Sequence, residues 1–133
     1  MRPSFRVDGI PIWITYVTGL LAIFSTFLGV MGLIDPTTVM GYFKGADHLA
    51  SAWAGRNAGI GLAMAIAFYL RDPAAYAAVF MAAIFREIGD SFSISYINAV
   101  GVTGLGVFLL FDIIAFALSF RVALKARASR GSP

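Results

Sequence analysis

The sequence contains no cysteine and only one histidine among its 133 residues. The lack of cysteine excludes disulfide bonds, thiolate metal ligands and a cysteine nucleophile. The single histidine, His48, excludes a haem held by two histidines of one chain. With its neighbour Asp47 it provides too few ligands for a metal, which needs three or four. We therefore predict no metal site, and the sequence identifies no cofactor.

Charged residues are also scarce, because they make up 13% of the chain while hydrophobic residues make up 59%, and the mean hydropathy is +0.83. A soluble domain of this length could not bury so much apolar surface, so we predict a single domain, residues 1–133, that lies mostly in a lipid bilayer. The basic residues gather toward the two ends of the chain, which is typical of the cytoplasmic edge of a membrane protein. We therefore predict no nucleic-acid partner despite a pI near 9.6.

Four apolar segments are each long enough to cross a membrane as a helix, which takes about 20 residues. They cover approximately residues 12–34, 49–70, 74–97 and 101–120. Charge and proline end the first two segments, and the connections at 71–73 and 98–100 are short, so the helices on either side of each must be antiparallel neighbours. The predicted fold is all-α, an integral membrane antiparallel four-helix bundle.

The connection between the first two segments, residues 35–48, begins with Asp35 and Pro36, which favour the start of a helix. We predict a short interfacial helix after the first span, and the alternative is an ordinary loop that happens to be apolar. Four spans place both termini on one side of the membrane. Because the termini carry most of the basic residues, we predict a multi-pass protein of the cell membrane with both termini in the cytoplasm.

The helical period of 3.6 residues assigns faces for packing within the bundle. In the first segment one narrow stripe consists of Thr15, Thr18, Ala22, Ser25, Gly29 and Gly32. In the second segment small residues recur every four positions, at Gly55, Gly59, Ala63 and Ala67. Small residues at such a spacing let helix backbones approach closely in lipid, so we predict that both stripes are packing faces.

Polar residues interrupt the last three apolar segments at six positions: Arg56, Asn57, Arg86, Glu87, Asp90 and Asp112. Ionisable side chains at membrane depth are costly, so they usually face the bundle interior and mark function. At a rise of about 1.5 Å per residue, Arg56 and Asp90 both lie about 10 Å deep. By the same measure Arg86 and Asp112 both lie about 16 Å deep. We predict these two ion pairs, which leave Glu87 without a cation.

This charged cluster has two interpretations. It is either an ion-pair network that fixes the register of the helices, or a polar pocket that binds a small lipophilic molecule. A buried glutamate without a cation tends to keep its proton and can then act as an acid or a base. The candidates for acid–base catalysis are therefore Glu87 and Asp112, and the candidates for ligand binding are Arg56, Asn57, Arg86 and Asp90. Whether the protein is an enzyme stays open at this point.

Two short motifs, Arg56-Asn57-x-Gly59 in the second segment and Ile88-Gly89-Asp90 in the third, resemble the DoxX-like group of small four-helix bacterial membrane proteins. The resemblance implies a four-helix bundle in the bacterial inner membrane, with Arg56 and Asp90 inside it. Some members of that group are linked to oxidoreductase complexes as partner subunits. The resemblance therefore implies an alternative function, a non-catalytic accessory subunit that packs against a larger redox or energy-converting membrane complex. A partner membrane protein, a second copy of the chain and a small lipophilic ligand all stay open as partners.

Overall fold

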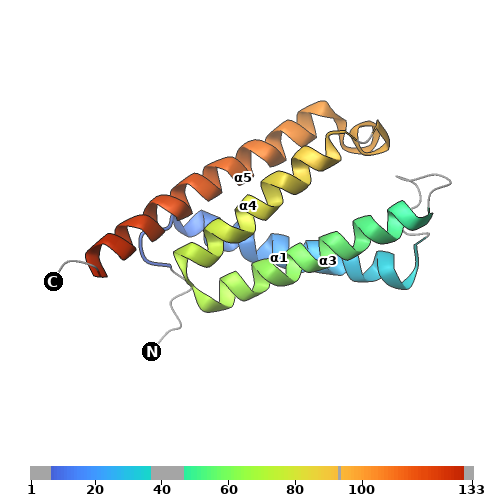
Figure 1. Ribbon diagram of the computed structural model, residues 1–133. Coiled ribbons are helices and arrows are strands. Elements are labelled where there is room, and N and C mark those ends of the chain that lie inside the picture. Colours follow the sequence, from blue (N-terminus) through green and yellow to red (C-terminus); the bar gives the residue numbers. More distant parts are fainter. Residues whose placement is uncertain (1–6, 37–46, 93, 131–133) are drawn as a thin grey trace.

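The computed structural model describes residues 7–36, 47–92 and 94–130, and it describes side chains for 7–36, 49–92 and 101–130. Within these ranges the chain forms four helices and no strand (Figure 1): α1 (Ile12–Ile34), α3 (Asp47–Leu70), α4 (Pro73–Asp90) and α5 (Ile94–Arg130). The all-α class predicted from the sequence is therefore confirmed. The predicted short helix after the first span falls on residues 37–46, which lie outside the described ranges.

The helices are arranged as two close pairs (Figure 1). α1 lies along α3 and α4 lies along α5, whereas the contact between α3 and α4 is smaller. The turn from α3 to α4 is short: Arg71 takes a left-handed backbone conformation with φ of 55°, and the Asp72 side chain accepts a hydrogen bond from the Ala74 N–H at 3.2 Å. The charged residues and the proline that predicted a helix end here therefore also cap the start of α4.

The predicted stripe of six small and polar residues on α1 is buried along its whole length, together with Ile14. Two glycines explain how α1 comes so close to α3. A methyl group built on Gly29 would overlap the backbone nitrogen of Ala58, and one built on Gly61 would lie 2.5 Å from the backbone nitrogen of Thr26. The two backbones are therefore in direct contact, and any side chain at these glycines would push the helices apart.

The stripe predicted on α3 is partly wrong. Gly59 is exposed, and a methyl group built on it would meet nothing within 4 Å. A repeat of four residues advances by about 400°, so it drifts by about 40° at each step from the helical period of 3.6 and leaves the packing face. The face that meets α1 instead carries Ala54, Ala58 and Gly61, at spacings of four and three.

The predicted end of the third segment near residue 97 is wrong, because α4 ends at Asp90. Ser91 closes the helix: its N–H donates to the Glu87 carbonyl at 2.9 Å, and its hydroxyl donates to the Ile88 carbonyl at 2.6 Å. An apolar stretch shows which residues avoid water, whereas capping hydrogen bonds decide where the helix stops.

The predicted start of the fourth segment at Gly101 agrees with the structure, because the stretch that is long and apolar enough to cross a membrane begins there. The predicted end at 120 is wrong, because the helix continues past it. Gly101 interrupts α5 with φ of 74° and ψ of 157°, a conformation that suits glycine. The helix then runs on through a basic stretch to Arg130, because basic side chains are good helix formers that need no apolar surroundings.

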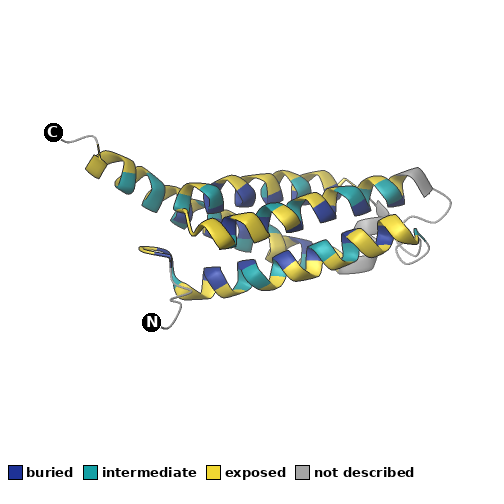
Figure 2. Cartoon of the chain, turned by 90° about the horizontal axis from the view of Figure 1, so that it is seen from below, coloured by how far each residue is buried: buried dark blue, intermediate teal, exposed yellow. Residues whose placement is uncertain are grey.

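Along each helix the buried residues face the other helices and the exposed residues face outward (Figure 2). Many of the exposed residues are large and apolar, among them Leu20 and Ile23 on α1, Ile66 on α3, Phe85 on α4 and Val102 on α5. Two segments, α1 and Gly101–Arg130, are long and apolar enough to cross a membrane. The outside of the protein is therefore apolar where a soluble monomer would be polar.

We predict that Gly29→Ala destabilises the protein by roughly 1–3 kcal/mol, because the added methyl group overlaps the α3 backbone. The matched control is Gly59→Ala, which adds the same group to open space and should be neutral or stabilising by about 0.5–1 kcal/mol, since alanine favours a helix over glycine. Thermal unfolding followed by circular dichroism measures both variants. Equal effects at the two positions would contradict the close contact between α1 and α3.

Candidate functional site

The charged residues predicted from the sequence come together between α3, α4 and α5. Arg56 on α3 contacts Asp90 on α4, and Asp112 on α5 is buried where the charges of Arg86 and Glu87 of α4 act on it. Arg86 also interacts electrostatically with Asp90, so the two pairs belong to one cluster. Glu87, Asp90 and Asp112 are all buried, and their surroundings are the apolar and small side chains of the bundle.

Arg56 and Asp90 form an ion pair in which Arg56 Nη2 donates to Asp90 Oδ1. The pair joins α3 to α4, as their opposite charges and matched positions led us to predict. The depth argument behind that prediction was nevertheless inaccurate, because Asp90 is the last residue of α4 rather than seven residues from its end. The Arg56 side chain is 38% exposed and that of Asp90 only 7%, so the carboxylate is the more deeply buried partner.

The predicted ion pair between Arg86 and Asp112 is wrong. Arg86 instead turns to its neighbour in sequence: Arg86 Nε donates to Glu87 Oε1 at 2.9 Å, and Arg86 Nη2 donates to the same oxygen. Glu87 therefore has a cation, contrary to prediction. Depth could not decide this pairing, because two carboxylates lie near the same level as Arg86 and its long side chain can bend toward either.

Two carboxylate oxygens in this cluster have no hydrogen-bond partner among the described residues. They are Glu87 Oε2 and Asp112 Oδ2, and their residues are only 1% and 3% exposed. A buried polar atom that makes no hydrogen bond costs about 1–3 kcal/mol, and more when it is charged. We call these two buried acids, each of which keeps one oxygen without a hydrogen-bond partner among the described residues, the carboxyl pair.

Asn57, the other predicted ligand-binding residue, is buried beside Arg56. Its amide nitrogen donates to the Trp53 carbonyl at 2.9 Å, one turn earlier in α3. One amide hydrogen is therefore used within the helix, and the residue is turned about 100° around the helix from Arg56. For Asn57, a role in ligand binding stays a prediction.

A second polar layer, which the sequence analysis did not single out, lies nearer the chain termini. Tyr76 of α4 and Ser119 of α5 are fully buried, and their hydroxyl groups, like that of Thr15 on α1, have no hydrogen-bond partner among the described residues. Tyr76 stands eleven residues, about three turns, before Glu87 on the same face of α4. That spacing was a signal in the sequence that could have identified Tyr76 as an inward-facing polar residue.

Aromatic rings separate this second layer from the carboxyl pair. Phe80 packs against Tyr76 with ring centroids 6.5 Å apart and against Phe111 of α5 at 5.9 Å, and Phe111 in turn contacts Trp13 of α1 at 5.6 Å. Because Phe80 lies between Tyr76 and Glu87 along α4, these rings close the cluster on the side of the termini. Any molecule that meets the carboxyl pair would approach from another direction.

Among the described residues, no three histidine, aspartate or glutamate side chains lie close enough together to hold a metal ion. No protein-family model, curated protein or solved structure matches the chain. The resemblance to the DoxX-like group therefore rests on its two short motifs and stays a prediction.

We predict that Asp90→Asn and Arg56→Gln each destabilise the protein, because each leaves one charge of a partly buried pair without its partner. The double variant should recover part of the loss, with a coupling free energy of roughly 1–3 kcal/mol. Chemical unfolding of the native protein, the two single variants and the double variant gives the four free energies of this double-mutant cycle. Asp8→Asn, which removes an exposed acid outside the cluster, is the control and should change little. Additive effects of Asp90→Asn and Arg56→Gln would show that the two side chains act independently.

Proposed function

We propose that the protein is an integral membrane protein whose four helices span the bilayer as an antiparallel bundle. Its buried carboxyl pair, in this proposal, binds a small lipophilic molecule and exchanges protons with it. The observation that carries the proposal is the position of Glu87 and Asp112, two almost fully buried neighbouring acids that each keep an oxygen without a hydrogen-bond partner among the described residues.

The placement in a membrane is supported by how little of the most apolar segments is buried. Only 28% of the most apolar stretch of α1 and 17% of that in Gly101–Arg130 are covered by the rest of the protein. The core helix of a soluble protein meets the same test of length and hydropathy, but most of it is covered. α3 and α4 are less apolar because they carry the charged cluster, in which both acids of α4, Glu87 and Asp90, are buried.

The proposed orientation follows from the basic residues. Four spans return the chain to its starting side, so the turn at Arg71 and the basic end of α5 share the side of the N-terminus. Lysine and arginine are retained on the cytoplasmic side of a membrane, which puts both termini in the cytoplasm.

We predict that single cysteines at Asp8, Asp72 and Ser129 are labelled by a membrane-impermeant maleimide only after the cells are permeabilised. A cysteine at Phe92, which is 83% exposed at the opposite end of α4, should be labelled in intact cells. The chain lacks cysteine, so each variant carries one reactive thiol. Labelling of Asp72→Cys and Phe92→Cys from the same side would contradict a membrane-spanning α4.

The lipophilic character of the proposed ligand follows from the environment of the carboxyl pair. Residues that flank the pair on the inner faces of α4 and α5 are small or apolar: Ala83, Leu105 and Ala115 are all buried. A ligand in this position would meet hydrocarbon around most of its surface and two carboxyl oxygens at one place. Sites of this kind, mostly apolar with a few converging polar groups, are typical of small-molecule binding.

The proposed chemistry follows from the different partners of the two acids. Two neighbouring negative charges in an apolar interior repel each other strongly, so one shared proton lowers their electrostatic free energy. Arg86 holds Glu87 Oε1 and so favours Glu87 as the ionised partner, which leaves the proton to Asp112. Glu87 would then accept a proton from a bound molecule, and Asp112 would donate one at another atom, as in an isomerisation.

We predict that the purified protein carries a small lipophilic molecule that solvent extraction and mass spectrometry can detect. Glu87→Gln and Asp112→Asn should both lower its amount at least about tenfold, because an amide cannot take part in the same proton exchange or ionic contact. Asp8→Asn, which removes an exposed acid, should retain it. Circular dichroism checks that the variants are folded.

Equal amounts of the molecule in all variants, or none in the native protein, would overturn the proposal. A protein partner at a fixed ratio that is lost in Glu87→Gln, with no small molecule present, would support the accessory-subunit alternative instead.

A further inference from the structure

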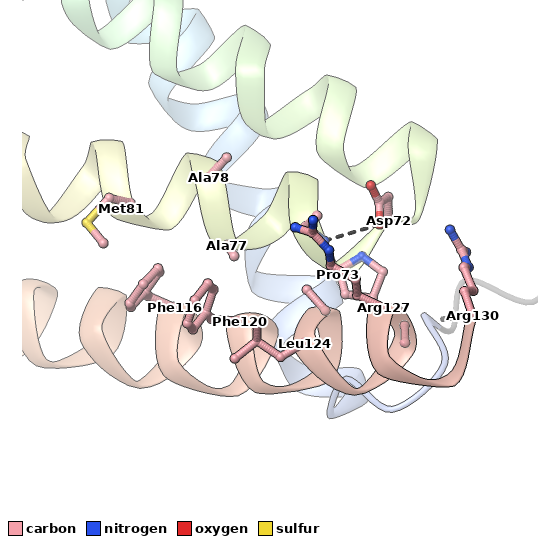
Figure 3. A pocket seen from close by; sticks show the side chains of 13 residues that line it. Asp72, Pro73, Ala77, Ala78, Met81, Phe116, Phe120, Leu124, Arg127 and Arg130 are labelled. Atoms are coloured by element: carbon pink, nitrogen blue, oxygen red, sulfur yellow. Dashed lines mark hydrogen bonds between the residues drawn. The ribbon is translucent and has the colours of Figure 1, made fainter. Parts of the chain in front are cut away.

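A groove of about 680 Å³ lies between α4 and α5, far from the carboxyl pair and near the C-terminus (Figure 3). One part of its lining is apolar, with Met81 of α4 and Phe116, Phe120 and Leu124 of α5. The other end carries Arg127 and Arg130. The groove therefore changes from hydrocarbon to positive charge along its length.

On the side formed by α5, the change from apolar to basic residues follows from the sequence of this helix. Phe116, Phe120, Ala123, Arg127 and Arg130 follow one another at spacings of four, three, four and three, which keeps them on one face of the helix. The two phenylalanine rings stack with centroids 5.4 Å apart and an interplanar angle of 17°, so they form a flat apolar surface. Eleven residues separate Phe116 from Arg127, a rise of about 16 Å.

The side of the groove formed by α4 carries mostly small side chains. Ala77 points toward the aromatic rings, and its methyl group leaves space beside them, whereas Ala78 lies on the exposed side of α4 (Figure 3). Asp72 stands at the charged end, where its side chain accepts the hydrogen bond from the Ala74 N–H that caps α4. With two arginines and one aspartate, this end has a net charge of +1.

We propose that this groove binds one anionic phospholipid of the cytoplasmic leaflet, with its phosphate on Arg127 and Arg130 and one acyl chain along Phe120 and Phe116. The inference rests on the membrane placement in the proposed function. The guanidinium group matches a phosphate with two parallel hydrogen bonds, and the cytoplasmic leaflet is rich in anionic lipids. The apolar lining of α5 from Phe116 to Leu124 rises about 12 Å, which fits within one leaflet, half of a hydrocarbon core of about 30 Å.

The arrangement of apolar and basic residues along the groove favours a lipid over the helix of a partner protein. A lipid presents its charge at one end and hydrocarbon along the rest, as the groove requires. A membrane helix of a partner protein would need an acidic residue opposite the two arginines and an apolar face opposite the rings. We commit to the lipid because the negative leaflet and the basic end lie at the same level in the proposed orientation.

The test compares two defined lipids, phosphatidylglycerol and phosphatidylcholine with identical acyl chains, bound to the purified protein in native mass spectrometry. The native protein should retain phosphatidylglycerol in preference. Arg127→Gln with Arg130→Gln should reduce this preference about tenfold, because each basic residue near an anionic lipid surface adds measurably to binding. The matched control, Arg121→Gln with Lys125→Gln, removes the same charge from α5 outside the groove lining and should keep the preference.

Two further variants separate the headgroup from the chain. Asp72→Asn should strengthen the preference for phosphatidylglycerol, because asparagine caps a helix as well as aspartate does but carries no negative charge. Ala78→Phe places a ring on the exposed side of α4 in the groove and should reduce retention of both lipids alike.

Three results would overturn the lipid site: no preference in the native protein, an equal loss in the two double variants, or a protein rather than a lipid cross-linked from Ala78→Cys. Failure of the membrane placement would be recognised separately, because it would change the cysteine labelling pattern. If that pattern holds and the lipid preference is missing, only the groove assignment is wrong.

Discussion

The ion pair between Arg56 and Asp90 joins one pair of helices to the other. α1 packs closely on α3 and α4 on α5, but α3 and α4 share only a small contact, and the ion pair spans it. Because a charge is costly to leave alone in an apolar interior, this pair restricts how α4 can rotate against α3.

The rotation of α4 in turn determines what lies inside the bundle. Tyr76, Phe80, Ala83, Glu87 and Asp90 follow at spacings of four, three, four and three, and all five are buried. A turn of α4 by one residue, about 100°, would take Asp90 away from Arg56 and Glu87 away from Asp112 together. The structural role of Asp90 and the proposed functional role of Glu87 therefore depend on the same face of α4.

The helical period of the sequence predicted a packing face correctly, whereas the sequence did not predict which acid each arginine contacts. The α1 stripe followed from the 3.6-residue period, and the Arg56–Asp90 pair from opposite charge and approximate level. The exposed Gly59 shows the limit of a four-residue repeat, which drifts off a packing face. The Arg86–Glu87 contact shows another limit, because a flexible side chain with two acids in reach has no pairing that spacing can identify. The end of α4 at Asp90 depended on capping hydrogen bonds rather than on hydropathy.

The excess of acid in the cluster does not depend on which pairs form. Two arginines, Arg56 and Arg86, face three carboxyl groups, so one negative charge remains whichever acid each arginine chooses. The sequence count identified this excess and assigned it to Glu87, whereas the structure leaves Asp112 without an arginine contact among the described residues. In the proposed membrane placement an isolated charge at this depth is costly, so we expect the last carboxyl to hold a proton or to meet a polar group of another molecule. A cluster built only to hold the helices together would need no third acid, and this excess of acid supports the proposed proton exchange.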